Sequence, residues 1–299
     1  MDDIIYCCVM TDRSEFKDAS PELLSALGYD FSSWKDEESG EIRHTFYFST
    51  EKDSLDAKRV LEEKDAEFQS FGIHFTAFAC TKLKKEDWAE AWKIHFKPLV
   101  ISETLAIAPS WEHFEAAPGQ IVVKLDPGMS FGTGQHATTK SCLASIDRRI
   151  AELRSAGTGE IAMLDAGSGS GILAIAASKL GCTRADAFDI DPDTVGVARE
   201  NARKNGIADG ELSLAVASLM EYESGIRYDI VAANILSSAL LAGKEKLLSF
   251  CKPGGRLILA GILEKEYDGV KAAFEATGRC TELFSIQEKE WRGGTYLVK

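Results

Sequence analysis

The stretch Leu164-Asp165-Ala166-Gly167-Ser168-Gly169-Ser170-Gly171 decides the fold of this 299-residue chain. An apolar run precedes it and an apolar helical pattern follows as far as Leu180, so its glycines lie where a strand turns into a helix. Only glycine tolerates so tight a turn and lets a ligand approach the backbone closely. A dinucleotide-binding fingerprint would place its third glycine at position 172, which is isoleucine here, so the spacing disfavours a dehydrogenase.

Strands and helices alternate after residue 160. Helices are expected at 170–180, 192–205, 237–250 and 264–277, and strands at 161–166, 185–190, 212–217, 229–235 and 256–262. This alternation predicts an α/β fold with a doubly wound, parallel, Rossmann-like sheet. The last two expected strands, 281–287 and 295–298, follow each other directly, which predicts an antiparallel hairpin at the edge of the sheet.

The front of the chain predicts a separate, smaller domain. Residues 1–82 are expected to form an α+β, ferredoxin-like domain with strands at 4–10, 42–49 and 73–80 and helices at 21–28 and 54–71. Residues 83–110 are expected to hold a linker helix and connector, because four aromatic side chains recur there at helical spacing before Pro98: Trp88, Trp92, His95 and Phe96. Residues 111–299 would be the catalytic domain.

The net charge of the chain limits the kinds of partner that it can bind. The net charge is -13, and residues 1–100 hold 13 Lys and Arg against 21 Asp and Glu. Nucleic-acid binding demands a basic face, so we expect no direct nucleic-acid contact and favour a basic protein partner. No stretch approaches the roughly 20 apolar residues that span a bilayer, and the acidic start lacks a secretory pattern, so we expect a cytoplasmic protein without membrane contact. We take it to be a monomer, although no sequence feature sets the oligomeric state.

The seven cysteines predict neither a metal site nor a disulfide framework. They are scattered, with no C-x-x-C spacing and no cysteine–histidine cluster. We expect reduced thiols that pack as small apolar side chains.

Asp189 is the candidate ligand for the ribose of a nucleoside cofactor. It lies at the end of the second expected strand, 22 residues after Gly167, where a carboxylate can accept hydrogen bonds from both ribose hydroxyls. Asp191 competes for this role, but it precedes Pro192 and is expected to cap the next helix instead.

The loop at residues 125–140 makes the resemblance specific. Its sequence LDPGMSFGTGQHATTK, together with Asn234-Ile235-Leu236 and Pro109-Ser110-Trp111-Glu112, resembles the ribosomal protein L11 methyltransferases (the PrmA family). The G-x-G-x-G turn likewise resembles class I S-adenosylmethionine-dependent methyltransferases. The resemblance runs from Trp88 to near the C-terminus and implies methyl transfer from S-adenosylmethionine to lysine side chains and the N-terminal amine of ribosomal protein L11.

The resemblance also implies roles for individual residues. Cofactor contacts are expected from Thr139, Gly167, Gly169, Asp189 and Asn234, with Asn234 aligning the amine. Phe131 would cover the cofactor or else anchor its own loop, and His136 would orient the amine or else bind backbone. Many amino-methylating enzymes read N-P-P-Y where this chain has Asn-Ile-Leu, which argues against base-amino and glutamine-amide substrates. At the end of the third strand Ala217-Ser218 replaces the usual acid, so the adenine contacts stay open.

Two other functions remain open at this point. The chain could methylate another protein or a small amine, which incubation with labelled cofactor and whole ribosomal proteins would reveal. It could also be a cofactor-binding adaptor that has lost turnover, although the Gly167, Asp189 and Asn234 set speaks against that reading.

Overall fold

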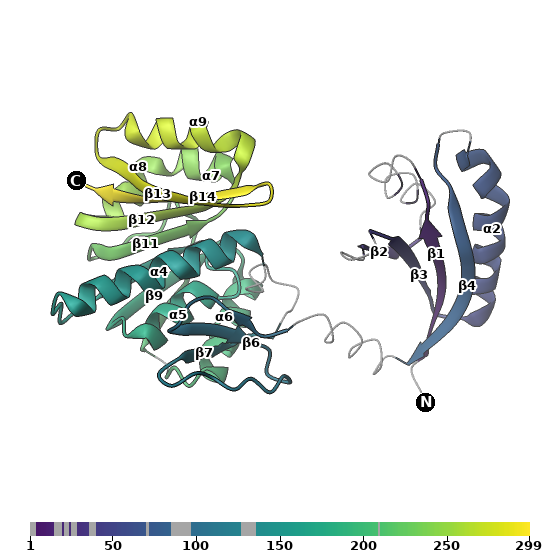
Figure 1. Ribbon diagram of the computed structural model, residues 1–299, viewed down its shortest axis with the longest axis horizontal. Coiled ribbons are helices and arrows are strands. Elements are labelled where there is room, and N and C mark those ends of the chain that lie inside the picture. The colour runs from purple at the N-terminus through teal and green to yellow at the C-terminus, as the bar shows by residue number, and fades with distance from the viewer. Residues whose placement is uncertain are drawn as a thin grey trace. The chain divides into compact units, whose positions relative to one another are not determined.

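The computed structural model describes residues 4–14, 20, 24, 29–35, 40–69, 72–84, 97–126, 136–208 and 210–299 (Figure 1). The chain divides into two compact units, residues 1–95 and 96–299. Among the described residues no helix is long and apolar enough to cross a membrane. The predicted linker helix with Trp88 and Trp92 lies outside the described residues.

The first unit is an antiparallel sheet packed against one long helix. Its strands, in the spatial order β2-β3-β1-β4, are β1 (Ile4–Asp12), β2 (Phe31–Lys35), β3 (Ile42–Phe48) and β4 (Phe75–Lys84). Helix α2 (Glu51–Gln69) contributes Leu61 and Phe68 to a core shared with Met10, Phe46 and Phe75. This order agrees with the predicted ferredoxin-like arrangement. Strand β2 was not predicted, and most of the helix expected at 21–28 lies outside the described residues.

The second unit is built on a seven-stranded sheet, as predicted. Its order is β10-β9-β8-β11-β12-β14-β13, and the first five strands are parallel. The bounds are β8 Ala162–Ala166, β9 Arg184–Asp189, β10 Leu212–Val216, β11 Tyr228–Asn234, β12 Cys251–Leu263, β13 Cys280–Glu288 and β14 Trp291–Val298. The predicted antiparallel hairpin is confirmed, with β14 between β12 and β13 and β13 alone at the edge.

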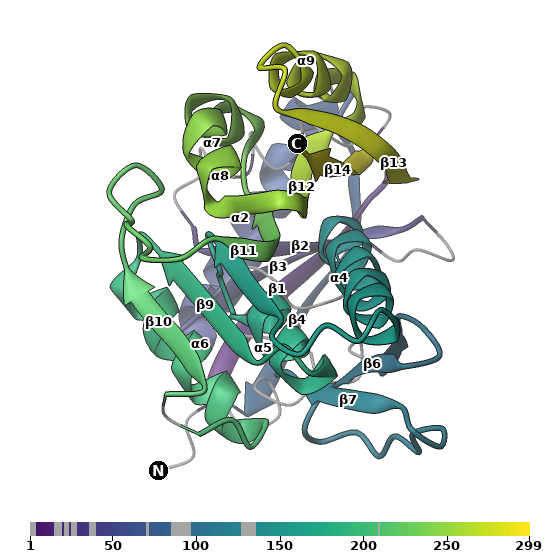
Figure 2. The same ribbon diagram turned by 90° about the vertical axis from the view of Figure 1, so that its left-hand side faces the viewer.

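Helices cover both faces of this sheet (Figure 2). Helices α4 (Ala137–Ser155) and α5 (Ile172–Leu180) fill one apolar core. The other core holds α7 (Ser237–Ala242), α8 (Lys244–Phe250) and α9 (Glu264–Glu275). Burial on both faces explains why β8 and β11, in the middle of the sheet, are largely apolar in sequence.

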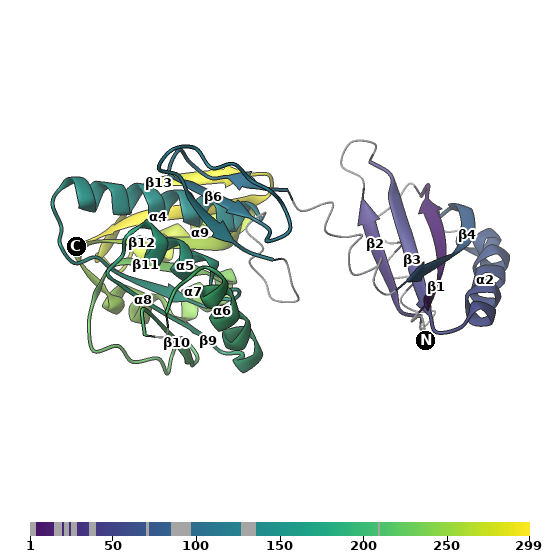
Figure 3. The same ribbon diagram turned by 90° about the horizontal axis from the view of Figure 1, so that it is seen from below.

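Two features of the second unit differ from the prediction. The single helix expected at 237–250 is two helices that meet at Gly243, where a Cβ atom would lie 2.1 Å from the side chain of Leu219. Residues 99–124 also contain a small unpredicted sheet of β5 (Leu99–Val100), β6 (Leu105–Ala108) and β7 (Ile121–Lys124), which lies beside α4 (Figure 3). These strands have only two to four residues, too few to show a periodic pattern.

Candidate functional site

The glycine turn follows β8 as expected and is held against β9. The backbone N–H groups of Gly167 and Ser168 both donate to the carbonyl of Phe188 at 2.9 Å. Gly167, Gly169 and Gly171 all have left-handed backbones, with φ of 78°, 52° and 78°. A Cβ atom on Gly167 would also lie 2.4 Å from Cγ2 of Ile235, so both backbone conformation and space require glycine there.

Asp189 ends β9, and its carboxylate lies against this turn. One oxygen accepts from the Gly169 N–H at 2.9 Å, and the other accepts from the Asp191 N–H at 3.2 Å. A carboxylate offers about four acceptor positions, so capacity remains for ligand hydroxyls. The structure therefore brings the predicted ribose ligand and the glycine turn together.

Asp191 has the geometry expected of a helix cap. It precedes α6 (Pro192–Lys204), and its side chain accepts from the Asp193 N–H at 2.9 Å and from Thr194 Oγ1 at 3.1 Å. Its carboxylate thus has local structural partners at the helix start.

Asn234 ends β11 and meets the first turn of α4. Its Nδ2 donates to Oγ1 of the buried Thr139 at 3.4 Å. Its Oδ1 is buried and has no hydrogen-bond partner among the described residues. An unpaired buried acceptor is costly, so this oxygen suits a donor supplied by a ligand.

His136 caps α4. Its Nδ1 lies 2.7 Å from Thr138 Oγ1 and 3.4 Å from the Thr138 N–H, and its ring packs edge-on against Trp291 with centroids 4.9 Å apart. Burial lowers the pKa of His136, which favours a neutral ring near pH 7. The contact with the Thr138 N–H is the one expected if His136 binds backbone. His136 also lies three residues before Thr139, at the same end of α4. Phe131, predicted to cover the cofactor, lies outside the described residues.

Asp165 is a member of the site that we did not single out from the sequence. It is fully buried in β8, just before the glycine turn, and among the described residues its Oδ2 accepts a single long bond, of 3.3 Å, from the Ala174 N–H. Burial raises the pKa of Asp165 to about 7, with a further contribution from the charge of Asp189. An acid inside an otherwise apolar strand was the signal available in the sequence.

This pKa makes the stability of the protein depend on pH. The folded state binds the Asp165 proton more tightly than the unfolded state, so the contribution of Asp165 to stability falls as pH rises from about 4 to about 7 and is level above. We expect Asp165→Asn to remove this slope and to be more stable than the parent at pH 8 by a few kcal/mol, since a pKa unit is worth about 1.4 kcal/mol. Urea unfolding at pH 5 and pH 8 measures it, with the exposed Asp268→Asn as control. Parallel pH curves for the parent and Asp165→Asn would contradict this.

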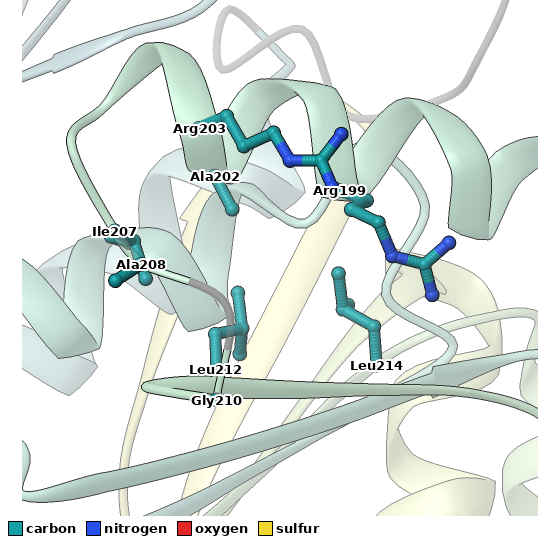
Figure 4. A pocket seen from close by; sticks show the side chains of 8 residues that line it. All are labelled: Arg199, Ala202, Arg203, Ile207, Ala208, Gly210, Leu212 and Leu214. Atoms are coloured by element: carbon teal, nitrogen blue, oxygen red, sulfur yellow. The ribbon is translucent and has the colours of Figure 1, made fainter.

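A surface pocket of about 200 Å³ lies apart from this site (Figure 4). Arg199 and Arg203 of α6 stand over Leu212 and Leu214 of β10. Leu212 pairs with Ala185 near the start of β9, about 13 Å along the strand from Asp189 at the rise of an extended chain. The pocket therefore lies toward the amino ends of β9 and β10, whereas Asp189 lies at the carboxyl end of β9.

The described residues contain no cluster of three or more His, Cys, Asp or Glu side chains that could hold a metal ion. All seven cysteines are free, and five of them are buried, in agreement with packing as apolar side chains.

Comparisons with known proteins identify relatives along most of the chain. The family model described as ribosomal protein L11 methyltransferase (PrmA) matches residues 22–293. The ribosomal protein L11 methyltransferase of Citrifermentans bemidjiense is 44% identical over 196 residues, which are 66% of this chain and 63% of that protein, somewhat less than two thirds of its length. That of Caldanaerobacter subterraneus subsp. tengcongensis is 35% identical over 261 residues, 85% of this chain and 79% of that protein.

A solved structure is similar as well. The crystal structure of ribosomal protein L11 methylase from Lactobacillus delbrueckii subsp. bulgaricus is 32% identical, with a TM-score of 0.60, and the match covers 68% of this chain and 100% of that chain.

Proposed function

Because this chain belongs to the ribosomal protein L11 methyltransferase (PrmA) family, we propose that it transfers methyl groups from S-adenosylmethionine to amino groups of ribosomal protein L11. Both lysine side chains and the N-terminal amine are acceptors in this proposal. The observation that carries it is the position of Asn234, beside Thr139 and next to Ile235, whose side chain lies against the Gly167 turn.

Some residues of the site bind the cofactor, and others position the acceptor amine. The turn at Gly167 and Gly169 holds the methionine part of S-adenosylmethionine, and Asp189 binds its ribose. When bound, the cofactor supplies a methyl group on a sulfonium, which is already activated for in-line displacement and needs no metal. Thr139 supports the side chain of Asn234.

Asn234 aligns the acceptor amine. Its Oδ1, which has no hydrogen-bond partner in the part of the chain that the structure describes, accepts an N–H of the amine, and this directs the nitrogen lone pair away from Asn234. A lysine amine has a pKa near 10.4 in water and must lose its proton before attack. A poorly solvated site lowers that pKa, and solvent takes the proton. Catalysis is therefore chiefly positioning, which can supply a large part of a rate enhancement.

Residues 1–82 recognise the substrate in this proposal, and 83–110 connect them to the catalytic domain at 111–299. Residues 1–100 carry 21 acidic against 13 basic side chains, which complements a basic ribosomal protein. The enzyme acts as a cytoplasmic monomer without contacting nucleic acid.

Intact-mass analysis tests the proposal. Purified L11 is incubated with the enzyme and S-adenosylmethionine, and mass increments of 14 Da per methyl group are expected. L11 with its amines acetylated beforehand is the control and should gain nothing. Transfer only to other proteins of a whole ribosomal extract would refute the substrate, and cofactor binding without any transfer would refute the activity.

A substitution at His136 distinguishes a role in orienting the amine from a role in capping α4 alone. Asparagine is a good helix cap but loses the ring contact with Trp291, so we expect His136→Asn to stay folded with a loss of at most about 1 kcal/mol of stability. If His136 orients the amine, kcat falls about tenfold in His136→Asn, through the misplaced nucleophile. Turnover of L11 and thermal melting measure the two effects. Undiminished kcat in His136→Asn would leave His136 a helix cap alone.

A further inference from the structure

Ile235 fills a space that two glycines leave open, one in the turn after β8 and the other in β12. A Cβ atom on Gly167, after β8, would lie 2.4 Å from Ile235 Cγ2. A Cβ atom on Gly261, in β12, would lie 2.5 Å from the carbonyl oxygen of Ile235 and 3.1 Å from its nitrogen. Both glycines have left-handed backbones, with φ of 78° and 81°. Ile235 is therefore clamped by its side chain on one side and by its backbone on the other.

Gly261 lies in a bulge of β12. Leu259 pairs with Gly294 of β14 and Ile262 pairs with Arg292, so Ala260 and Gly261 together face Gly293 alone. On the opposite edge of β12, Ala260 pairs with Asn234. A left-handed glycine in a bulge bends its strand locally, and bulges near functional sites often redirect neighbouring residues. Here the bend coincides with the point where β11 ends.

Ile235 connects the turn that binds the cofactor with Asn234, which aligns the acceptor amine in the proposed reaction. The side chain of Ile235 rests on Gly167, whose N–H is fixed to Phe188, next to the Asp189 that binds Gly169. The backbone of Ile235 continues directly from Asn234, which aligns the acceptor amine in the proposed function. Ile235 thus has contact with the cofactor turn and a covalent link to the acceptor side.

We infer that Ile235 is a positioning residue that sets the distance between the cofactor turn and Asn234, and that Gly261 fixes Ile235 in place. This inference rests on the proposed function. In-line transfer depends steeply on alignment, and a misplacement of about 1 Å can cost about 100-fold in rate. A shift of Ile235 therefore affects turnover more than it affects binding of either substrate.

Gly261→Ala and Gly254→Ala form a matched pair. Gly254 lies in the same strand with φ of 79°, but a Cβ there meets nothing within 4 Å. Both variants place a side chain in a left-handed backbone, and only Gly261→Ala presses on Ile235. We expect Gly261→Ala to lower kcat for L11 by about 10- to 100-fold. Its KM and its Kd for S-adenosylhomocysteine should stay within about threefold of the parent, while Gly254→Ala should keep kcat within about twofold.

A double-mutant cycle tests the other side of the clamp. Gly167→Ala should weaken S-adenosylhomocysteine binding, and Ile235→Ala removes the Cγ2 atom that the new Cβ would strike. We expect Gly167→Ala combined with Ile235→Ala to recover part of the lost affinity, because residues in contact are not additive. Isothermal titration measures all four proteins and requires no turnover.

The outcomes are separable. If the parent never methylates L11, the proposed function fails. The double-mutant cycle of S-adenosylhomocysteine binding still tests whether Ile235 packs on Gly167. If the parent is active and Gly261→Ala matches Gly254→Ala in kcat, the inference is overturned, as it is by an additive cycle. Should Gly261→Ala not fold by thermal melting, Ile235→Ala alone replaces it, with reduced kcat and retained S-adenosylhomocysteine binding expected.

Discussion

Asn234→Ala is expected to lower kcat for methylation of L11 by about 100-fold while the Kd for S-adenosylhomocysteine changes little. Asn234 ends β11, its buried Oδ1 has no partner among the residues that the structure describes, and in the proposed function this oxygen orients the attacking amine. Alanine removes the acceptor without adding bulk. Steady-state kinetics with varied L11, together with calorimetric titration of S-adenosylhomocysteine, separates the loss of turnover from any loss of binding.

The matched control for Asn234 is its neighbour in the hydrogen-bond network. Thr139→Ser keeps the hydroxyl that accepts from Nδ2 and should therefore retain most of the turnover. Near-full turnover in Asn234→Ala, with both substrates binding as in the parent, would show that Asn234 does not align the amine.

Asp189→Ala is expected to raise the Kd for S-adenosylhomocysteine by about 10- to 100-fold, because hydrogen bonds to a charged group are worth roughly 1.5–3 kcal/mol. The carboxylate lies against Gly169 and has acceptor capacity left for the ribose. At saturating cofactor, kcat should recover much of its parent value, since the ribose hydroxyls that Asp189 binds take no part in the displacement. Asp189→Asn keeps one acceptor for the Gly169 N–H and should show a smaller loss in the same direction.

Asp191→Ala supplies the contrasting case two residues away. Its carboxylate caps α6, so the expected effect is a loss of about 1 kcal/mol of stability with almost unchanged cofactor affinity. Equal effects of Asp189→Ala and Asp191→Ala on the Kd would undo the assignment of the ribose to Asp189. Urea unfolding and calorimetric titration of the same preparations make the comparison direct.

The sequence predicts those features of the fold that depend on local pattern. The parallel strands β8, β9 and β11 were predicted, and Gly167, Asp189 and Asn234 lie at their carboxyl ends, so their meeting at one edge of the sheet could be foreseen. Strand β2 was missed because three of the five residues in FSSWK are polar and, among the described strands, it pairs only with β3. The strands at 99–124 are too short to carry a periodic signal of their own.

The finer geometry of the site depends on contacts that are remote in sequence. His136 meets Trp291, and Thr139 meets Asn234, across long separations that no local pattern encodes. Gly261 reads in sequence as one more small residue in an apolar strand. Its left-handed backbone and its contact with Ile235 arise only when β12 pairs with β11 on one side and β14 on the other.

Strand β11 lies deep in the sheet, with β8 and β12 on its two sides, and β14 protects β12 in turn. Amides in such strands exchange with solvent mainly through opening of the whole domain, whereas those of the edge strands β10 and β13 exchange through smaller openings. We therefore expect the amides of β11, which ends at Asn234, to exchange more slowly than those of β10 and β13. On heating, Asn234 should lose its position only when the whole sheet unfolds. Local unfolding of the edge strands should leave Asn234 in place.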